Sequence, residues 1–93
     1  MAKKYYEIGL MSRVSPVEFD YETIEWEEDF DRVADARKVA VRMSKKCPFK
    51  DYHGRRVDAI QITCHSDEPG ISSYYLHWSE LYEGGKMTLR ITY

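Results

Sequence analysis

The sequence predicts an α+β domain of two layers, in which an antiparallel sheet of about five strands carries one main helix on one face. One stretch has the apolar spacing of an amphipathic helix, and most of the remaining chain alternates apolar and polar residues in strand-length runs. Turn-forming residues separate these runs, which gives the order strand, strand, helix, strand, strand, strand. A length of 93 residues suits a single compact domain spanning residues 1–93.

The first two strands are expected at residues 4–14 and 17–26. Both segments alternate apolar and polar side chains, and Ser15-Pro16 separates them because proline cannot donate a hydrogen bond to a strand ladder. The apolar positions of the second segment change parity before Ile24. A slip of one residue inverts the two faces of a strand, so we expect a bulge near Thr23.

The main helix is expected from Asp29 to Cys47. Its apolar residues recur at spacings of three and four and form one stripe: Phe30, Val33, Ala36, Val39 or Ala40, Met43 and Cys47. Asp29 or Asp31 is a suitable N-cap, and Pro48 follows the last residue as a stop signal. The following segment, 48–56, shows no periodicity and is expected to be a loop.

Three further strands are expected at residues 57–65, 71–83 and 86–93. Gly84-Gly85 suits the tight turns that require positive φ, so the last two strands are expected to form a hairpin. Counting outward from this turn pairs apolar residues on one face: Tyr82 with Met87, Trp78 with Ile91, and Leu76 with Tyr93.

Glu80 interrupts the apolar face of this hairpin, where the register places it opposite Leu89. A buried ionised carboxylate is costly unless it has a partner, a raised pKa or access to solvent. We therefore favour an arrangement in which a bulge turns Glu80 outward and Leu81 inward, or in which this position extends beyond the helix.

The composition excludes several classes of protein. With 43% hydrophobic and 32% charged residues, the chain has the material for a core and is unlike a disordered tail. No apolar run approaches the roughly 18 residues that span a bilayer, so no membrane partner is expected. Two cysteines are too few for a disulfide scaffold and fit reduced thiols, which favours a cytoplasmic location.

The sequence does not predict an enzyme, a metal site or a cofactor. The potential zinc ligands lack the usual spacing of zinc clips: Cys47, His53, Cys64, His65 and His77. Neither a G-x-S-x-G elbow nor a glycine-rich phosphate loop is present. A catalytic group built from Cys64, His77 and Glu80 is an alternative that requires an activity sensitive to thiol alkylation.

Charge is segregated along the chain although the net charge is only −2. Residues 18–35 contain nine acids and one base, and residues 37–56 contain eight bases and one acid. Glu18, Asp20 and Glu22 would project from one strand face at intervals of about 6.5–7 Å, close to the spacing of phosphates along a nucleic acid. The acidic strip that we expect to contact a partner comprises Glu18, Asp20, Glu22, Glu25, Glu27, Glu28, Asp29 and Asp31, with Tyr21 and Trp26 as aromatic contacts.

We therefore expect a non-enzymatic protein-binding module whose acidic strip blocks a basic, nucleic-acid-binding surface on a larger protein. In layout and charge the chain is similar to small accessory proteins of phages and mobile elements, among them anti-CRISPR and anti-restriction inhibitors. That similarity implies an inhibitor of a nucleic-acid-handling complex. The strand at 86–93 would also offer a sheet edge on which two copies can pair as a homodimer.

The alternative is a small RNA- or DNA-binding domain. Its basic patch would lie at the helix end and in the loop that follows: Lys45, Lys46, Lys50, Arg55 and Arg56. Phe49 and Tyr52 lie among these bases and could stack on nucleobases. Such domains typically have a pI above about 9, whereas the pI of this chain is 5.9. Nucleic-acid binding is therefore the second choice.

Overall fold

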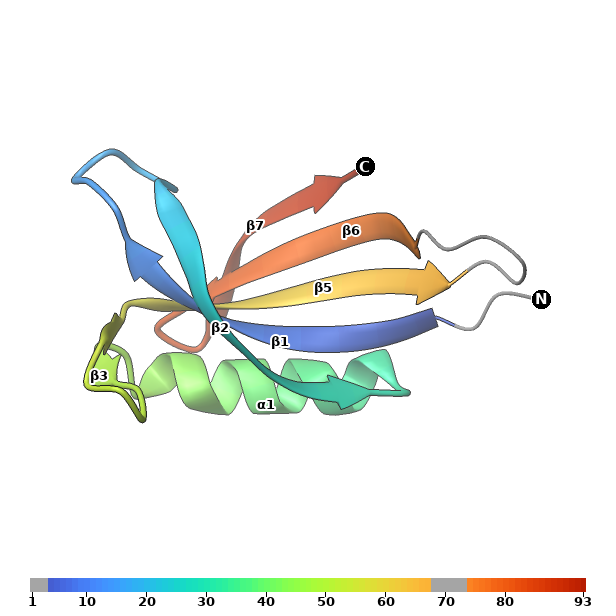
Figure 1. Ribbon diagram of the computed structural model, residues 1–93, viewed down its shortest axis with the longest axis horizontal. Helices are drawn as coiled ribbons and strands as arrows, with labels where there is room; N and C mark the ends of the chain where they lie inside the picture. The colour runs from blue at the N-terminus through green and yellow to red at the C-terminus, as the bar shows by residue number, and fades with distance from the viewer. Residues whose placement is uncertain (1–3, 68–73) are drawn as a thin grey trace.

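The computed structural model describes residues 4–67 and 74–93, and it confirms the α+β architecture (Figure 1). One antiparallel sheet has the strand order β2-β1-β5-β6-β7, and one helix packs against one of its faces. The main elements are β1 (Lys4–Arg13), β2 (Tyr21–Phe30), α1 (Val33–Lys45), β5 (Ala59–Asp67), β6 (Tyr74–Glu83) and β7 (Lys86–Thr92). In the described ranges, no helix combines the length and the apolar character that crossing a membrane requires.

The segment expected to be a loop contains two short strands. β3 (Phe49–Lys50) and β4 (Arg56–Val57) pair with each other as a small separate sheet beyond the end of α1. The expected strand at 57–65 therefore begins as β4 and continues as β5. The expected strand at 71–83 is seen from Tyr74 onward, and its first residues, 71–73, lie outside the described part of the chain.

The helix packs closely because its innermost residues are small. Ala36, Ala40 and Ser44 follow one another at intervals of four and are fully buried against the sheet. Ile8 and Leu10 of β1 lie in the same core together with Ile60 and Ile62 of β5. This layer between helix and sheet is the main hydrophobic core.

The helix begins later than the sequence predicts. Asp29 and Phe30 belong to β2, where they pair with Glu7 and Tyr6 of β1. The N-cap of α1 is Arg32, whose side chain makes no capping hydrogen bond. The expected capping by Asp29 or Asp31 is therefore wrong, because pairing with β1 keeps the chain extended up to Phe30.

The bulge expected near Thr23 is confirmed, but the second strand lies further along the chain than predicted. The register between β1 and β2 shifts between Leu10 and Met11, opposite Thr23 and Glu25. Residues 14–20, which include the start of the predicted strand, form the turn between β1 and β2. Phe19 adopts a φ of 61° in this turn, and Val14 donates a backbone hydrogen bond of 2.9 Å to the Asp20 carbonyl.

The β6–β7 hairpin follows the prediction only near its turn. Gly84 and Gly85 have φ values of 59° and 86°, and Tyr82 pairs with Met87 as expected. A bulge beyond Tyr82 then shifts the register by one residue, so Trp78 pairs with Thr92 and not with Ile91. The amide of Tyr93 bonds to the His77 carbonyl at 3.0 Å, so its expected pairing with Leu76 is also wrong.

Candidate functional site

Glu80 is buried in the layer between helix and sheet, with only 1% of its surface exposed. Arg37 of α1 donates two hydrogen bonds to its carboxylate, of 3.0 and 2.8 Å, and Arg90 of β7 donates a third of 3.1 Å. The hydroxyl of Tyr82 donates a fourth, of 2.8 Å. The expectation that Glu80 turns outward is wrong, because the bulge in β7 places Arg90 opposite it instead of Leu89.

These contacts make Glu80 a structural ion-pair centre. Burial alone would raise its pKa, but the hydrogen bonds from Arg37 and Tyr82 and the charges of Arg37 and Arg90 hold the pKa below its ordinary value. The two guanidinium groups also lie over the ring of Trp78, at 5.6 and 4.7 Å from its centroid. The carboxylate is thus ionised and fully engaged, which does not suit it to proton transfer.

The cysteines and histidines named in the sequence lie in separate environments. Cys64 is fully buried in the sheet opposite Trp78, and burial raises the pKa of its thiol. Burial also raises the pKa of Cys47, to about 11. His77 is bonded to Ser66, with 2.7 Å between Nε2 and Oγ, and His53 lies beside Tyr52 in the loop between β3 and β4. Both thiols are therefore protonated at neutral pH, which makes them weak nucleophiles.

The regular spacing expected for Glu18, Asp20 and Glu22 is not found. Glu18 and Asp20 lie in the turn before β2, where the carboxylate of Asp20 accepts a short hydrogen bond from Ser15. Glu22 is the first of the three in a strand, opposite Ser12 of β1. The spacing fails because residues 14–20 turn back on themselves and do not extend.

The remaining acids follow β2, an edge strand of the sheet. Glu25 lies 3.5 Å from the guanidinium of Arg55. Glu27 and Glu28 are exposed at the second bulge of the β1–β2 pair. Asp29 lies beside Glu7, and Asp31 is exposed just before α1. We call the exposed carboxylates of Glu22, Glu27, Glu28 and Asp29 the acidic edge.

The two aromatic residues expected at a partner surface lie on the face of the sheet away from α1. The ring of Trp26 covers Gly9, where a Cβ atom would come within 2.9 Å of it, and yet 46% of Trp26 is exposed. Tyr21 donates a short hydrogen bond to Glu83 and accepts one of 2.6 Å from Arg13. Burial and the neighbouring Glu83 raise the pKa of Tyr21 to about 12.

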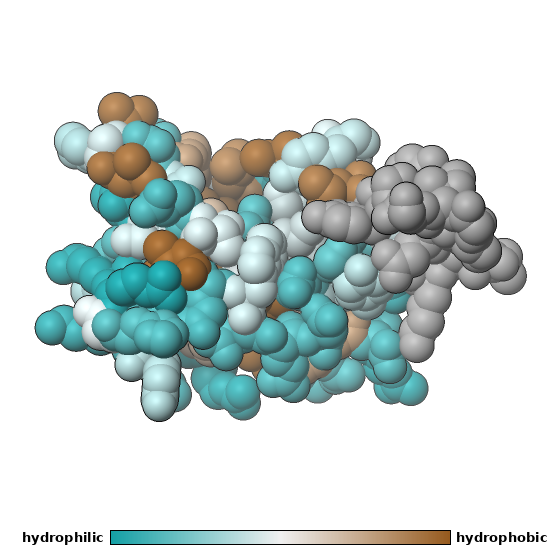
Figure 2. Space-filling view, in the orientation of Figure 1, coloured by the Kyte–Doolittle hydropathy of each residue, from teal (hydrophilic) through white to brown (hydrophobic). Residues whose placement is uncertain are grey.

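A shallow hollow of about 160 Å³ lies on the same face and was missed from the sequence. The start of β2 and the end of β7 curve away from α1, and brown, apolar residues gather on this upper side of the molecule (Figures 1 and 2). The hollow is lined by Met11, Phe19, Tyr21, Gln61, Ser79, Leu81, Leu89 and Ile91. The sequence does contain a signal for this hollow. Apolar residues occupy odd-numbered positions of β1, β6 and β7, while even-numbered positions of β1, β5 and β6 form the core.

The basic patch is reduced by internal ion pairs. Arg55 pairs with Asp51 at 2.9 Å as well as with Glu25, and Arg56 pairs with Asp58 at 2.7 Å. Burial would raise the pKa of Asp51 and Asp58, but hydrogen bonds from Arg55 to Asp51, and from the Arg13 backbone amide and Arg56 to Asp58, hold both pKa values below the ordinary value. Three exposed lysines complete the patch: Lys45, Lys46 and Lys50.

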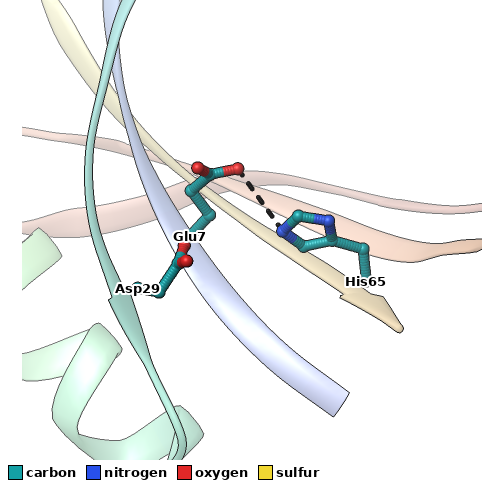
Figure 3. A group of neighbouring side chains, drawn as sticks. All are labelled: Glu7, Asp29 and His65. Carbon is teal, nitrogen blue, oxygen red and sulfur yellow. Dashed lines mark ion pairs between the residues drawn. The ribbon is translucent and has the colours of Figure 1, made fainter. Parts of the chain in front are cut away.

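A further group of polar side chains, also missed from the sequence, lies on three neighbouring strands. It consists of Glu7 of β1, Asp29 of β2 and His65 of β5 (Figure 3). One ligand atom from each residue lies within 4.8 Å of the others, and Nε2 of His65 is 3.4 Å from Oε1 of Glu7. The group could not be predicted from the sequence, because its members are far apart in the chain and the apolar pattern places Asp29 in the helix.

Comparisons with protein-family models, with curated proteins and with solved structures find no match to this chain.

Proposed function

We propose that the chain is a non-enzymatic protein-binding module that docks through the open face of its sheet. The observation that carries this proposal is the apolar hollow on that face, together with the exposed Trp26 on the same face and the acidic edge along the edge strand β2. An apolar centre with a polar, charged rim is the usual anatomy of a protein interface.

Met11, Ala59 and Leu81 form a small buried cluster at the centre of this face, but the apolar side chains around them are much more exposed than those of the main core. Phe19, Trp26 and Ile91 are 38%, 46% and 43% exposed, whereas the core residues beneath α1 are almost completely buried. Large apolar side chains grouped on a surface are costly in water and often mark an interaction site. A partner that covers this face would remove that cost.

The acidic edge gives the partner its charge. Glu22, Glu27 and Glu28 are exposed, and a row of carboxylates on one strand favours approach by a basic surface. We propose that the partner is a larger protein whose basic surface otherwise holds nucleic acid, so that the chain acts as an inhibitor of it. Direct binding of nucleic acid is less well supported, because Arg55 and Arg56 are already paired with carboxylates.

Neutralising the acidic edge tests this proposal. The triple variant Glu22→Gln, Glu27→Gln, Glu28→Gln is expected to associate about tenfold more slowly, at low salt, with the partner protein once crosslinking from the open face has identified it. Its association rate should also depend less on salt, because rim charges act mainly through long-range attraction. Surface plasmon resonance at several salt concentrations measures both effects.

A matched control changes the net charge equally without altering the edge. The variant Tyr52→Lys, His53→Lys, Thr92→Lys adds three positive charges at exposed positions of the loop and of β7. It should keep most of the wild-type association rate. Equal slowing in both variants would mean that net charge alone matters and would contradict a specific acidic edge.

A further inference from the structure

The Glu7, Asp29 and His65 side chains converge because of the strand register. Glu7 and Asp29 are directly opposite each other across β1 and β2. His65 pairs with Tyr5, two residues before Glu7 on β1, so His65 and Glu7 are diagonal neighbours on one face of the sheet. Three adjacent strands thus deliver two carboxylates and one imidazole to one point.

The charges at this point favour a cation. Two carboxylates opposite each other across a strand pair are destabilising. Within residues 4–67 and 74–93, Glu7 forms an ion pair with His65. No ion pair in these ranges joins Glu7 or Asp29 to a lysine or an arginine.

The imidazole is already oriented. His65 is only 7% exposed, and its ring packs on that of Tyr5, with 3.9 Å between the centroids and an interplanar angle of 45°. Figure 3 shows the ring turned toward the Glu7 carboxylate, with Asp29 beside Glu7. A ligand held by packing loses less conformational freedom when it binds an ion.

We propose that Glu7, Asp29 and His65 bind one divalent transition-metal ion of the Zn²⁺ type. Two ligands about 2.1 Å from a tetrahedral zinc ion lie about 3.4 Å apart. The distance between Nε2 of His65 and Oε1 of Glu7 is 3.4 Å. Asp29 is exposed on an edge strand, so a change of its rotamer closes the remaining separation.

The donor set also decides the class of ion. Nitrogen and oxygen ligands together suit zinc and its neighbours, whereas Mg²⁺ and Ca²⁺ prefer oxygen alone. Three protein ligands leave a fourth position open for water or for a side chain of a partner. The ion would also tie the edge strand β2 to β1 and β5. This inference shares Asp29 with the acidic edge, but it requires no partner and is therefore tested separately from the docking proposal.

Titration of the reduced, tag-free protein with Zn²⁺, followed by isothermal calorimetry, tests the site. One ion per chain is expected, and a Zn²⁺ concentration of 100 times Kd should raise Tm by about 10–20 °C. The variants Asp29→Asn and His65→Gln should each weaken binding by at least about 10–100-fold, the loss that even outer-shell partners of a metal cause.

Two controls separate this site from other ligands on the chain. Glu27→Gln removes an exposed carboxylate of the same strand, and Cys47→Ser removes a partly buried thiol. Both variants should bind Zn²⁺ like the wild type. Asp29→Asn changes an exposed side chain and should fold normally, so it gives a result even if His65→Gln does not fold. Absence of saturable binding, or binding that Asp29→Asn leaves unchanged, would overturn the proposal.

Discussion

Replacing Arg37 and Arg90 together by alanine is expected to lower the free energy of unfolding by about 3–5 kcal/mol. The double variant leaves the carboxylate of Glu80 in the core with the Tyr82 hydroxyl but without either of its cations. A buried charge that loses its partners retains the full cost of its desolvation. Urea denaturation at pH 7 measures the change.

The same variant should also change how stability depends on pH. In the wild type the pKa of Glu80 is held below its ordinary value of 4.5, so its ion pairs stabilise the fold above that pH. This contribution is lost as the pH falls through the folded-state pKa. Without the arginines, burial dominates and raises the pKa of Glu80. Lowering the pH then protonates this carboxylate and removes part of the destabilisation of the variant. The difference in stability between the two proteins should therefore be largest at neutral pH and shrink toward pH 4.

A control for this prediction removes two cations from the outer side of the helix. Lys38 and Arg42 are exposed on α1, so the variant Lys38→Ala, Arg42→Ala should cost about 1 kcal/mol or less. If the Arg37→Ala, Arg90→Ala variant lost no more than this control, Glu80 would not depend on its ion pairs.

The second large effect is expected from Ile62→Ala. Ile62 is fully buried in the central strand β5, between Ile8 of β1 and Glu80 of β6. Removing three carbon atoms there leaves a cavity beneath α1, so the expected loss is about 2–5 kcal/mol. Ile91→Ala, at a residue that is 43% exposed on the open face, should cost less than about 1 kcal/mol.

This comparison distinguishes the two faces of the sheet. Chemical denaturation of both variants gives the free energies directly. A small loss for Ile62→Ala, or an equally large one for Ile91→Ala, would mean that the open face is a second core and would remove the reason to propose it as a docking surface.

The fold could be predicted from the sequence because local patterns determine its elements. The apolar stripe between Val33 and Cys47 is specific to a helix, and Gly84-Gly85 fixes a tight hairpin. The bulges in β2 and β7 are harder to predict. Only the parity shift at Ile24 signalled the bulge near Thr23, and nothing around Thr88 signalled the bulge in β7. The bulge in β7 decides whether Leu89 or Arg90 faces Glu80.

The candidate site was predicted less well, because it depends on contacts between distant strands. The negative charge of β2 was visible in the sequence, but the turn at residues 14–20 removes Glu18 and Asp20 from the strand. The hollow forms only because the turn before β2 and the strand β7 contribute side chains to the same face of the sheet. The group of Glu7, Asp29 and His65 requires the registers of two strand pairs, which no local pattern encodes.

Site-specific photo-crosslinking in the source cell tests the docking proposal most directly. A benzophenone side chain at position 89 would lie in the hollow, and one at position 42 would lie on the exposed side of α1. We predict one discrete adduct with a basic protein from position 89, reduced in yield in the Glu22→Gln, Glu27→Gln, Glu28→Gln variant, and no such adduct from position 42. The same adduct from both positions, or from position 42 alone, would contradict binding through the open face of the sheet.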